Sequence, residues 1–430
     1  MRDELRSLQI AIEQAQLPPD FLTLLGDLWD DSTKHFHVQE TYILDYKETI
    51  PSKFSDSYGA GIVRLALAFY NSFGGIIIFG VKDRELSVTG IGKPFDVESL
   101  NRVLSDCAGI GIECLTKTYA VESFDGPKAI SVVLVPRRGI TPPARLQRQL
   151  GEHLPGKVWL RDRAEVLEAT SKHLPLLYSN RRSLPSDFGD NNTVPIHRSF
   201  PPSPATMKSF IGRASLIETL WSWFIFGDQR RLYLHGPGGS GKTTLAFEFA
   251  RMLAETGQHI QSPSGESLDY VIFISGKETE LNPYTGKQEV FALRQFENAR
   301  EQYAQLLYHS GLLDQEEIAT ADENKLDLLL DDLFSNFSGL IVIDDIDALS
   351  RKKLDTGEET LFTKAILAKK RTRILYTLRF PPPYAIKSAL EVSGLDEKSE
   401  LMPFVEVCSI QFGIPMPASS GWNLTLGARV

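Results

Sequence analysis

Eight consecutive residues in the second half of the chain have the types and spacing of a phosphate-binding loop. Gly236-Pro-Gly-Gly-Ser-Gly-Lys-Thr243 fits the pattern G-x-x-x-x-G-K-T. Its glycines let backbone N–H groups surround phosphate oxygens without Cβ clashes, and the N-terminus of a following helix adds partial positive charge. We expect Lys242 to reach the β- and γ-phosphates of a nucleotide and the Thr243 hydroxyl to bind Mg²⁺. The phosphate-binding set is therefore Gly236, Gly238, Gly239, Ser240, Gly241, Lys242, Thr243 and Thr244.

A pair of acids farther along the chain supplies the other half of a nucleotide site. Gly339-Leu-Ile-Val-Ile-Asp344-Asp345 is an apolar run that ends in two carboxylates, which is the Walker B pattern. We expect Asp344 to hold Mg²⁺ through water and Asp345 to orient or deprotonate the attacking water. Together with the phosphate loop, this pair predicts an ATPase that uses ATP and Mg²⁺.

The flanking residues predict the strand–loop–helix context that such a loop requires. Leu232-Tyr-Leu234 is a short apolar run before the loop, and Leu245–Leu253 has helical apolar spacing after it. Strands that alternate with helices in this way predict a P-loop NTPase domain with a parallel sheet. Its further strands are expected at 269–275, 339–345 and 373–379, and its further helices at 290–309 and 322–336.

Two segments beside these motifs resemble parts of STAND and AAA-like ATPases. Phe210-Ile-Gly-Arg213 resembles the (F/V)-x-G-R segment that opens such domains, with a helix cap as the alternative interpretation. Thr377-Leu-Arg379 resembles their TTR segment, with Leu378 in place of a second Thr. The resemblance covers residues 207–415, and it implies that Arg213 contacts nucleotide and that Arg379 senses the γ-phosphate.

Three acids in the first half of the chain fall near the ends of predicted strands. Glu40 and Asp45 belong to a strand-like run that ends at Lys47, and Asp83 follows the apolar run 76–81. Mg²⁺ or Mn²⁺ in a phosphodiester-cleaving site needs converging carboxylates, because hard cations prefer oxygen ligands. Asp45 and Lys47 share one strand face, whereas Glu40 must lie on a loop or bulge to join them. From spacing alone, solvated surface acids are the alternative.

The same region resembles the Schlafen (AlbA-type) domain over residues 38–170. The resemblance rests on the E-x-x-x-x-D-x-K run at 40–47, on Ala-Phe-Tyr-Asn-Ser-Phe-Gly-Gly at 68–75, on Ile-Ile-Ile-Phe-Gly-Val-Lys-Asp at 76–83 with Val-Thr-Gly at 88–90, and on the closing segment 158–164. Some Schlafen members are metal-dependent RNases with three carboxylates. The resemblance therefore implies catalytic, metal-ligating roles for Glu40, Asp45 (where Glu is commoner) and Asp83, with Lys47 adding positive charge. Other relatives are nucleic-acid-binding domains, so catalysis does not follow from the resemblance alone.

Basic and histidine residues give weaker signals in this region. Arg137, Arg138, Arg145 and Arg148 are candidates for a phosphate groove, with an ordinary solvated loop as the equal alternative. His35 and His37 have no Cys or further His nearby, so a solvated loop pair is expected instead of a metal site.

Composition narrows the classes of protein that the chain can belong to. The net charge of −9 requires any nucleic-acid site to be a local basic groove. The 3 cysteines form no C-x-x-C pair, which favours a reducing, cytoplasmic setting. No stretch reaches the ~18 apolar residues of a membrane span, and the start lacks the apolar core of a signal peptide, so no membrane partner is expected.

These features predict an α/β protein in which an N-terminal α+β Schlafen-like domain precedes a P-loop NTPase domain with a small helical lid. The expected segments are N-terminal helices at 1–37, the Schlafen/AlbA-like domain at 38–170, a linker at 171–206, the STAND-type NTPase at 207–383 and the start of the lid at 384–430. STAND proteins normally continue into a winged helix and a sensor array, so we expect the chain to stop short of them or the sensing part to lie elsewhere.

By resemblance, such architectures serve bacterial defence against phage. ATP and a phage-derived or cellular trigger would drive homo-oligomerisation, and the clustered effector would act on tRNA, other RNA or DNA. The alternatives are an ATP-gated nucleic-acid-binding or transcription regulator without nuclease activity, and a scaffold whose ATPase is only a conformational switch.

Overall fold

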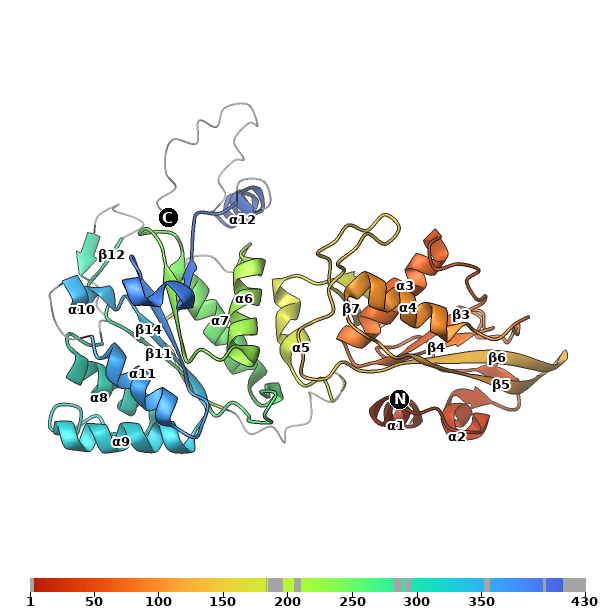
Figure 1. The fold of residues 1–430 in the computed structure, drawn as a ribbon, viewed down its shortest axis with the longest axis horizontal. Coiled ribbons are helices and arrows are strands. Elements are labelled where there is room, and N and C mark those ends of the chain that lie inside the picture. Colours follow the sequence, from red (N-terminus) through yellow and green to blue (C-terminus); the bar gives the residue numbers. More distant parts are fainter. Residues whose placement is uncertain are drawn as a thin grey trace, which may run out of the picture. The chain divides into compact units, whose positions relative to one another are not determined.

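The computed structural model divides the chain into two compact units, Met1–Asn191 and Asn192–Val430, each with its own core (Figure 1). The residues that the structure describes are 4–182, 184, 196–204, 210–281, 288–290, 295–351, 356–396 and 400–412.

The first unit is built on a four-stranded mixed sheet whose strands lie in the order β3-β4-β6-β5. Only β3 and β4 run parallel, and the other neighbours are antiparallel. Side chains alternate across the sheet, so that Ile77 and Phe79 face one core while Ile76 and Ile78 face another. The strands are β3 (Leu44–Lys47), β4 (Gly75–Phe79), β5 (Leu115–Ser123) and β6 (Gly126–Val135).

Helices cover both faces of this sheet (Figure 1). The longer pair, α3 (Ser57–Asn71) and α4 (Val97–Ala108), packs on the face of Ile77 and Phe79. The opposite face is covered by α1 (Arg6–Gln14) and α2 (Phe21–Leu25). The remaining short elements are β1 (Trp29–Asp30), β2 (His35–Phe36), β7 (Trp159–Asp162), β8 (Glu165–Glu168) and α5 (Leu174–Tyr178), with single 3₁₀ turns at Gly26–Leu28 and Ser171–His173.

The C-terminal end of α3 is tied to β7, which positions a site residue described below. The buried Asn71 side chain donates to the carbonyl oxygens of Ala144 and Trp159, and its own oxygen accepts the N–H of Ala144. The Ser72 hydroxyl accepts the backbone N–H of Arg161 at 2.8 Å. Because these partners are buried and satisfied, β7 is held in one register against the helix.

The second unit is built on a parallel sheet of 6 strands in the order β16-β10-β15-β14-β11-β9. One face packs on α8, α9 and α11, and the other on α7, whose Phe247 meets Phe273 of β11 edge to face.

The strands are β9 (His197–Ser199), β10 (Arg231–His235), β11 (Tyr270–Ser275), β14 (Gly339–Asp344), β15 (Arg373–Leu378) and β16 (Ala389–Glu391). The main helices are α6 (Ala214–Phe226), α7 (Lys242–Thr256), α8 (Ala299–Ser310), α9 (Glu323–Asn336), α11 (Glu358–Leu367) and α12 (Met402–Phe412). Shorter elements are the hairpin β12 (Thr279–Leu281) and β13 (Gln288–Val290), α10 (Asp347–Arg351), and 3₁₀ turns at Gly257–His259 and Pro383–Ser388.

The predicted fold class, an N-terminal α+β domain followed by a parallel-sheet domain, is confirmed. The parallel sheet reaches beyond the predicted range 207–383 at both ends, because β9 comes from the expected linker and β16 from the expected lid. The expected helix at 290–309 begins at Ala299, and Pro403 lies in the first turn of α12. His35 lies in β2 and not in a loop. The tail 416–430 lies outside the described residues. Within the part of the chain that is described, no helix has the length and apolarity needed to cross a bilayer.

Candidate functional site

The phosphate loop joins β10 to α7, as the sequence predicts. Gly236 has a φ of 150°, and a Cβ at this position would lie 2.4 Å from the carbonyl oxygen of Val392, so a side chain does not fit there. The Gly236 N–H donates to the carbonyl of Arg379 at 3.3 Å. The start of the loop is therefore fixed between the residues that follow β15 and β16.

The middle of the loop has the features of an anion cradle. A Cβ at Gly238 or Gly241 would meet nothing within 4 Å, so space is open above the backbone there. Gly241 adopts a left-handed φ of 86° immediately before the 15-residue helix α7, whose N-terminal end carries partial positive charge. The buried hydroxyl of Ser240 has no hydrogen-bond partner among the described residues. These observations fit a bound phosphate group.

Lys242 lies across its own loop. Its ammonium group donates to the carbonyl oxygens of Gly236 and Pro237, both at 2.9 Å. Burial lowers the pKa of Lys242, and the carboxylates of Asp347, Asp344 and Asp345 oppose that shift. Two neutral carbonyl oxygens thus hold the ammonium group in the loop. A phosphate oxygen is charged and is a stronger acceptor, so it can replace them.

The Asp344 carboxylate brings the two predicted motifs together. Its Oδ1 atom accepts hydrogen bonds from the Thr243 hydroxyl of the loop at 2.7 Å and from the Thr377 hydroxyl at 2.6 Å. Its Oδ2 atom accepts the Ser275 hydroxyl at 3.1 Å. Asp344 ends β14 and is separated from the loop strand by β15, which is why Thr377 of β15 reaches it. The hydroxyl of Thr243 and the carboxylate of Asp344 form an oxygen donor pair that suits Mg²⁺.

Asp345 sits on a strained backbone next to this carboxylate. Its φ is 54°, in the left-handed region that costs energy for a residue with a Cβ. Its N–H donates to the Thr377 hydroxyl at 2.9 Å, and the carbonyl of Asp344 accepts the N–H of Gly276. Contacts with Thr377 of β15 and with Gly276 after β11 therefore fix the backbone turn at Asp345, where the chain leaves β14.

Both arginines that the ATPase resemblance indicates lie at the loop. Arg213 occupies the N-cap position of α6, its guanidinium donates to the carbonyl of Ser240 at 3.0 Å, and its N–H donates to the Glu400 carboxylate. Burial lowers the pKa of Arg213, and Glu400 opposes this. Arg379 makes backbone contacts at the loop, and its N–H donates to the Asp347 carboxylate at 3.3 Å. The residue itself is exposed.

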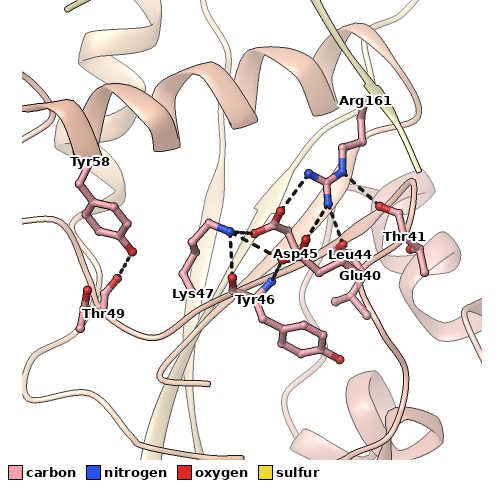
Figure 2. A network of polar contacts seen from close by, with 9 residues as sticks. All are labelled: Glu40, Thr41, Leu44, Asp45, Tyr46, Lys47, Thr49, Tyr58 and Arg161. Carbon is pink, nitrogen blue, oxygen red and sulfur yellow. Dashed lines mark hydrogen bonds and ion pairs between the residues drawn. The ribbon is translucent and has the colours of Figure 1, made fainter. Parts of the chain in front are cut away.

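In the first unit, the structure brings Glu40 and Asp45 together across a tight turn (Figure 2). The Thr41 N–H donates to the carbonyl of Leu44, so the chain reverses between the two acids. Glu40 then accepts the Tyr46 N–H at 3.1 Å. Glu40 therefore reaches Asp45 from the loop that precedes β3.

A buried arginine that the sequence analysis did not single out completes this cluster. Arg161 of β7, with a side chain only 2% exposed, lies 3.0 Å from Oδ2 of Asp45 and 3.4 Å from Oε2 of Glu40. It also donates to the carbonyls of Thr41 and Leu44. Arg161 follows Asp45 by 116 positions in the sequence. Nothing in the spacing of the Leu-Arg161-Asp segment indicated that its arginine would contact Asp45.

Lys47 closes the other side of the same pair. Its ammonium group contacts Oδ1 of Asp45 and lies 3.7 Å from Oε1 of Glu40. Burial raises the pKa of Glu40, with a further rise from Asp45, while Lys47 and Arg161 act in the opposite direction. Each carboxylate thus has one oxygen toward the buried Arg161 and one toward the partly exposed Lys47, and the cluster of two acids and two cations is close to neutral.

Asp83 is not grouped with these acids. It is exposed in the turn after β4, and among the described residues no three His, Cys, Asp or Glu side chains are placed to hold a metal ion. Among the described residues, Glu40 and Asp45 converge without Asp83, and the side chains that pair with them are Arg161 and Lys47.

The four arginines that were candidates for a phosphate groove lie in different environments. Arg138 is 2% exposed and donates to the carbonyls of Thr141 and Leu177, which fastens the end of α5 to the body of the unit. Arg145 donates to the carbonyl of Gly156, whereas Arg148 is exposed. Arg138 is therefore a structural residue, and the four arginines do not form one solvent-facing set.

The comparisons with known proteins agree with the resemblance to Schlafen (AlbA-type) domains and with the AAA-like part of the ATPase resemblance. Residues 40–169 match the family model described as Schlafen, AlbA_2, and residues 232–373 match the model of the ATPase family associated with various cellular activities (AAA). No curated protein matches the chain.

Three solved structures have parts of low similarity to this chain. ORC from Drosophila, solved bound to DNA, is 16% identical with a TM-score of 0.34, covering 49% of this chain and 48% of that one. Cdc6p from Pyrobaculum aerophilum is 12% identical with a TM-score of 0.28, covering 44% and 48%. PCH-2 from C. elegans is 12% identical with a TM-score of 0.24, covering 49% and 52%. The chain thus spans about half the length of each. At these TM-scores, the similarities say nothing about what this chain binds.

Proposed function

We propose that this chain, which carries a Schlafen/AlbA_2 domain followed by an AAA ATPase domain, uses ATP binding and hydrolysis to control a nucleic-acid-contacting N-terminal domain. The observation that carries the proposal is the Asp344 carboxylate, which accepts hydrogen bonds from Thr243 of the phosphate loop and Thr377 of the adjacent strand. The two halves of a nucleotide site are therefore already in contact in the folded chain.

Each residue of the ATP site has a defined task in this proposal. Lys242 exchanges its two carbonyl partners for phosphate oxygens, and Ser240, with an unused buried hydroxyl, contacts the same group. Thr243 and Asp344 hold Mg²⁺, which supplies charge neutralisation on the β- and γ-phosphates when bound. Asp345, fixed by its strained turn and by Thr377, orients the attacking water. Arg213 contacts the loop at Ser240 and Arg379 contacts it at Gly236, where both respond to the nucleotide.

The nucleic-acid role of the first unit is supported by the charge of its acidic cluster. Two uncompensated carboxylates would repel a phosphate backbone, whereas Arg161 and Lys47 neutralise Glu40 and Asp45. Lys47, with a side chain 27% exposed, is the member of the cluster most accessible to solvent and to a ligand.

The test measures binding of fluorescent RNA and single-stranded DNA to the full chain with Mg-ADP or with a non-hydrolysable ATP analogue and Mg²⁺. We expect affinity to differ by at least about fivefold between the two states, and the difference to vanish in Lys242→Ala. Equal affinities in both states for the wild type, with ATP binding shown independently, would disprove control by ATP.

A second candidate function, phosphodiester cleavage, is supported by one specific arrangement. Glu40, Asp45 and Lys47 bring two carboxylates and an ammonium group together at a turn, which suits one divalent cation and a fixed positive charge. A cleavage assay with Mg²⁺ or Mn²⁺ under ATP-bound conditions tests this. Cleavage by the wild type that is lost in Glu40→Ala, with nucleic acid still bound, supports it, and cleavage that survives Glu40→Ala contradicts this site.

We further propose STAND-like regulation, as in bacterial defence against phage. Mg-ATP and a phage-derived or cellular trigger would assemble several copies, and the clustered Schlafen domains would then act on RNA or DNA. Cytoplasmic action fits the free, buried thiols of Cys107 and Cys114, which suit a reducing compartment. Light scattering in each nucleotide state tests assembly, since a monomer in every state with the trigger present would contradict it.

A further inference from the structure

A chain of hydrogen bonds leads away from the ATP site through the end of β11. The Ser275 hydroxyl donates to Oδ2 of Asp344 at 3.1 Å. Gln295 makes two hydrogen bonds to the backbone of Ser275. Its side-chain oxygen accepts the Ser275 N–H at 2.7 Å, and its backbone N–H donates to the Ser275 carbonyl at 3.0 Å. Phe296 follows in the core and lies against Gly276, which fixes Gln295 beside the strand.

The same chain continues to the edge strand of the sheet. The Gln295 side-chain nitrogen lies 2.7 Å from Nε2 of His309, at the end of α8. On the other side of the ring, Nδ1 of His309 lies 2.7 Å from the hydroxyl of Ser199 in β9. His197, also in β9, directs its Nε2 atom at the carbonyl of His309, 2.5 Å away. We call the series Asp344, Ser275, Gln295, His309 and Ser199 the relay.

Donor and acceptor rules assign every proton along the relay. The Ser275 N–H is a donor, so the oxygen of Gln295 must face it and the amide nitrogen must face His309. The Nε2 atom of His309 must then be an acceptor, which leaves the proton on Nδ1, where it donates to Ser199. The relay is complete only while His309 is neutral.

The surroundings of His309 favour that neutral form. Burial lowers the pKa of His309, and His197 of β9 lowers it further. On its own helix, the aromatic ring of Tyr308 lies edge-on at 5.1 Å and brings no charge to it.

The strand at the far end of the relay is weakly held by its sheet. β9 has 3 residues, and among the strands that the structure describes it lies at the edge of the sheet and pairs with β11 alone. Few backbone hydrogen bonds therefore secure it, so the contacts of Ser199 and His197 with His309 are a large part of its attachment. β9 is also the first described strand of the ATPase unit after the chain leaves the Schlafen domain.

We propose that Gln295 and His309 are positioning residues that couple Asp344 to β9, so that the nucleotide state changes how firmly the beginning of the ATPase unit is held. The proposal rests on the proposed function, because it needs ATP at Asp344, and it names how that site is regulated. The coupling passes through a contiguous set of hydrogen bonds from Asp344 to Ser199.

The test compares hydrogen exchange of the β9 amides in the full chain with Mg-ADP and with Mg²⁺ and a non-hydrolysable ATP analogue. We expect rates at Arg198 and Ser199 to differ by about fivefold or more in the wild type. In Gln295→Leu this difference should disappear while ATP affinity stays within about threefold of the wild type. Ser310→Ala is the matched control, because Ser310 lies on the same helix and its hydroxyl donates to the carbonyl of Leu307, away from the relay.

A second variant separates positioning from general structure. Gln295→Glu keeps an oxygen for the Ser275 N–H but turns a carboxylate toward His309, so it should raise the pKa of His309 in an NMR titration of the imidazole ring. An unchanged pKa, or a β9 response that survives Gln295→Leu, overturns the relay. A wild type that binds the ATP analogue without any β9 response also overturns it, whereas failure to bind ATP at all overturns the proposed function and the coupling together.

Discussion

The Thr377 hydroxyl donates to Asp344 at 2.6 Å and thereby joins the strand β15 to the last residue of β14. The same oxygen accepts the N–H of Asp345 at 2.9 Å. One hydroxyl therefore orients the carboxylate proposed to hold Mg²⁺ and fixes the strained residue proposed to orient water.

Replacing this hydroxyl should separate binding from hydrolysis. Thr377→Val removes the hydroxyl that accepts the Asp345 N–H and one of the two hydroxyls that donate to Oδ1 of Asp344, so we expect ATP turnover to fall by about 10- to 100-fold with only a few-fold loss of affinity. Thr372→Val is the matched control, since Thr372 is equally buried just before the same strand and bonds to Tyr270 and Phe337. Equal turnover losses in the two variants would mean that Thr377 acts only through stability.

The two motif residues at the centre of the site should differ in their effects. Lys242→Ala removes the cation of the loop, so ATP binding should be lost. Asp345→Ala removes the group that orients water but no phosphate contact, so binding should persist while hydrolysis stops. Calorimetric titration with ATP and a phosphate-release assay measure both. Wild-type turnover in Lys242→Ala would disprove the assignment of the site.

Arg161 should be the residue on which the acidic cluster depends most. Arg161→Met leaves two neighbouring carboxylates without their buried counter-charge, so we expect a loss of about 3–5 kcal/mol in the stability of the first unit. Lys47→Met should cost less, because Lys47 is more exposed. Hydrogen exchange of the β3 and β4 amides in the full chain reports the opening of this unit.

The pH dependence of this loss has a defined sign. The pKa of Glu40 is already raised in the folded chain, and removal of Arg161 should raise it further. A group with a raised folded pKa contributes stability that is present below its unfolded pKa and is lost as the pH rises through the folded value. The defect of Arg161→Met should therefore be larger near neutral pH than near the pKa of a free carboxyl. The reverse order would show that Glu40 and Arg161 are not coupled.

Sequence reasoning located the parts of this protein that depend on local pattern. The G-x-x-x-x-G-K-T loop and the apolar run before Asp344 carry their strand and helix context with them, so β10, α7 and β14 could be predicted within a few residues. The turn that brings Glu40 to Asp45 could be stated only as a requirement, because a spacing of five does not specify a reversal.

The missed residues are those that reach the sites through tertiary packing. Arg161 meets Asp45 because Asn71 and Ser72 fasten β7 to α3, a contact that no single segment encodes. Ser275 meets Asp344 because β11 and β14 are neighbours in the sheet, and Gln295 is linked to Asp344 through Ser275. For Ser275, the available signal in the sequence was its position as a polar residue at the end of an apolar strand.

Strand β9 should loosen as the pH falls through the titration of His309. The pKa of His309 is lowered in the folded chain, so the relay contributes stability that is present above the unfolded pKa of about 6.5 and is lost as the pH falls through the folded value. Below it, the protonated Nε2 atom opposes the Gln295 amide, and this contact breaks. Exchange rates of the β9 amides, corrected for their intrinsic pH dependence, should rise by about fivefold or more between pH of about 8 and about 5.5. His309→Asn should already show the fast rates at the higher pH and no such step, because its side chain does not titrate. A step of the same size in His309→Asn would assign the pH response to another group.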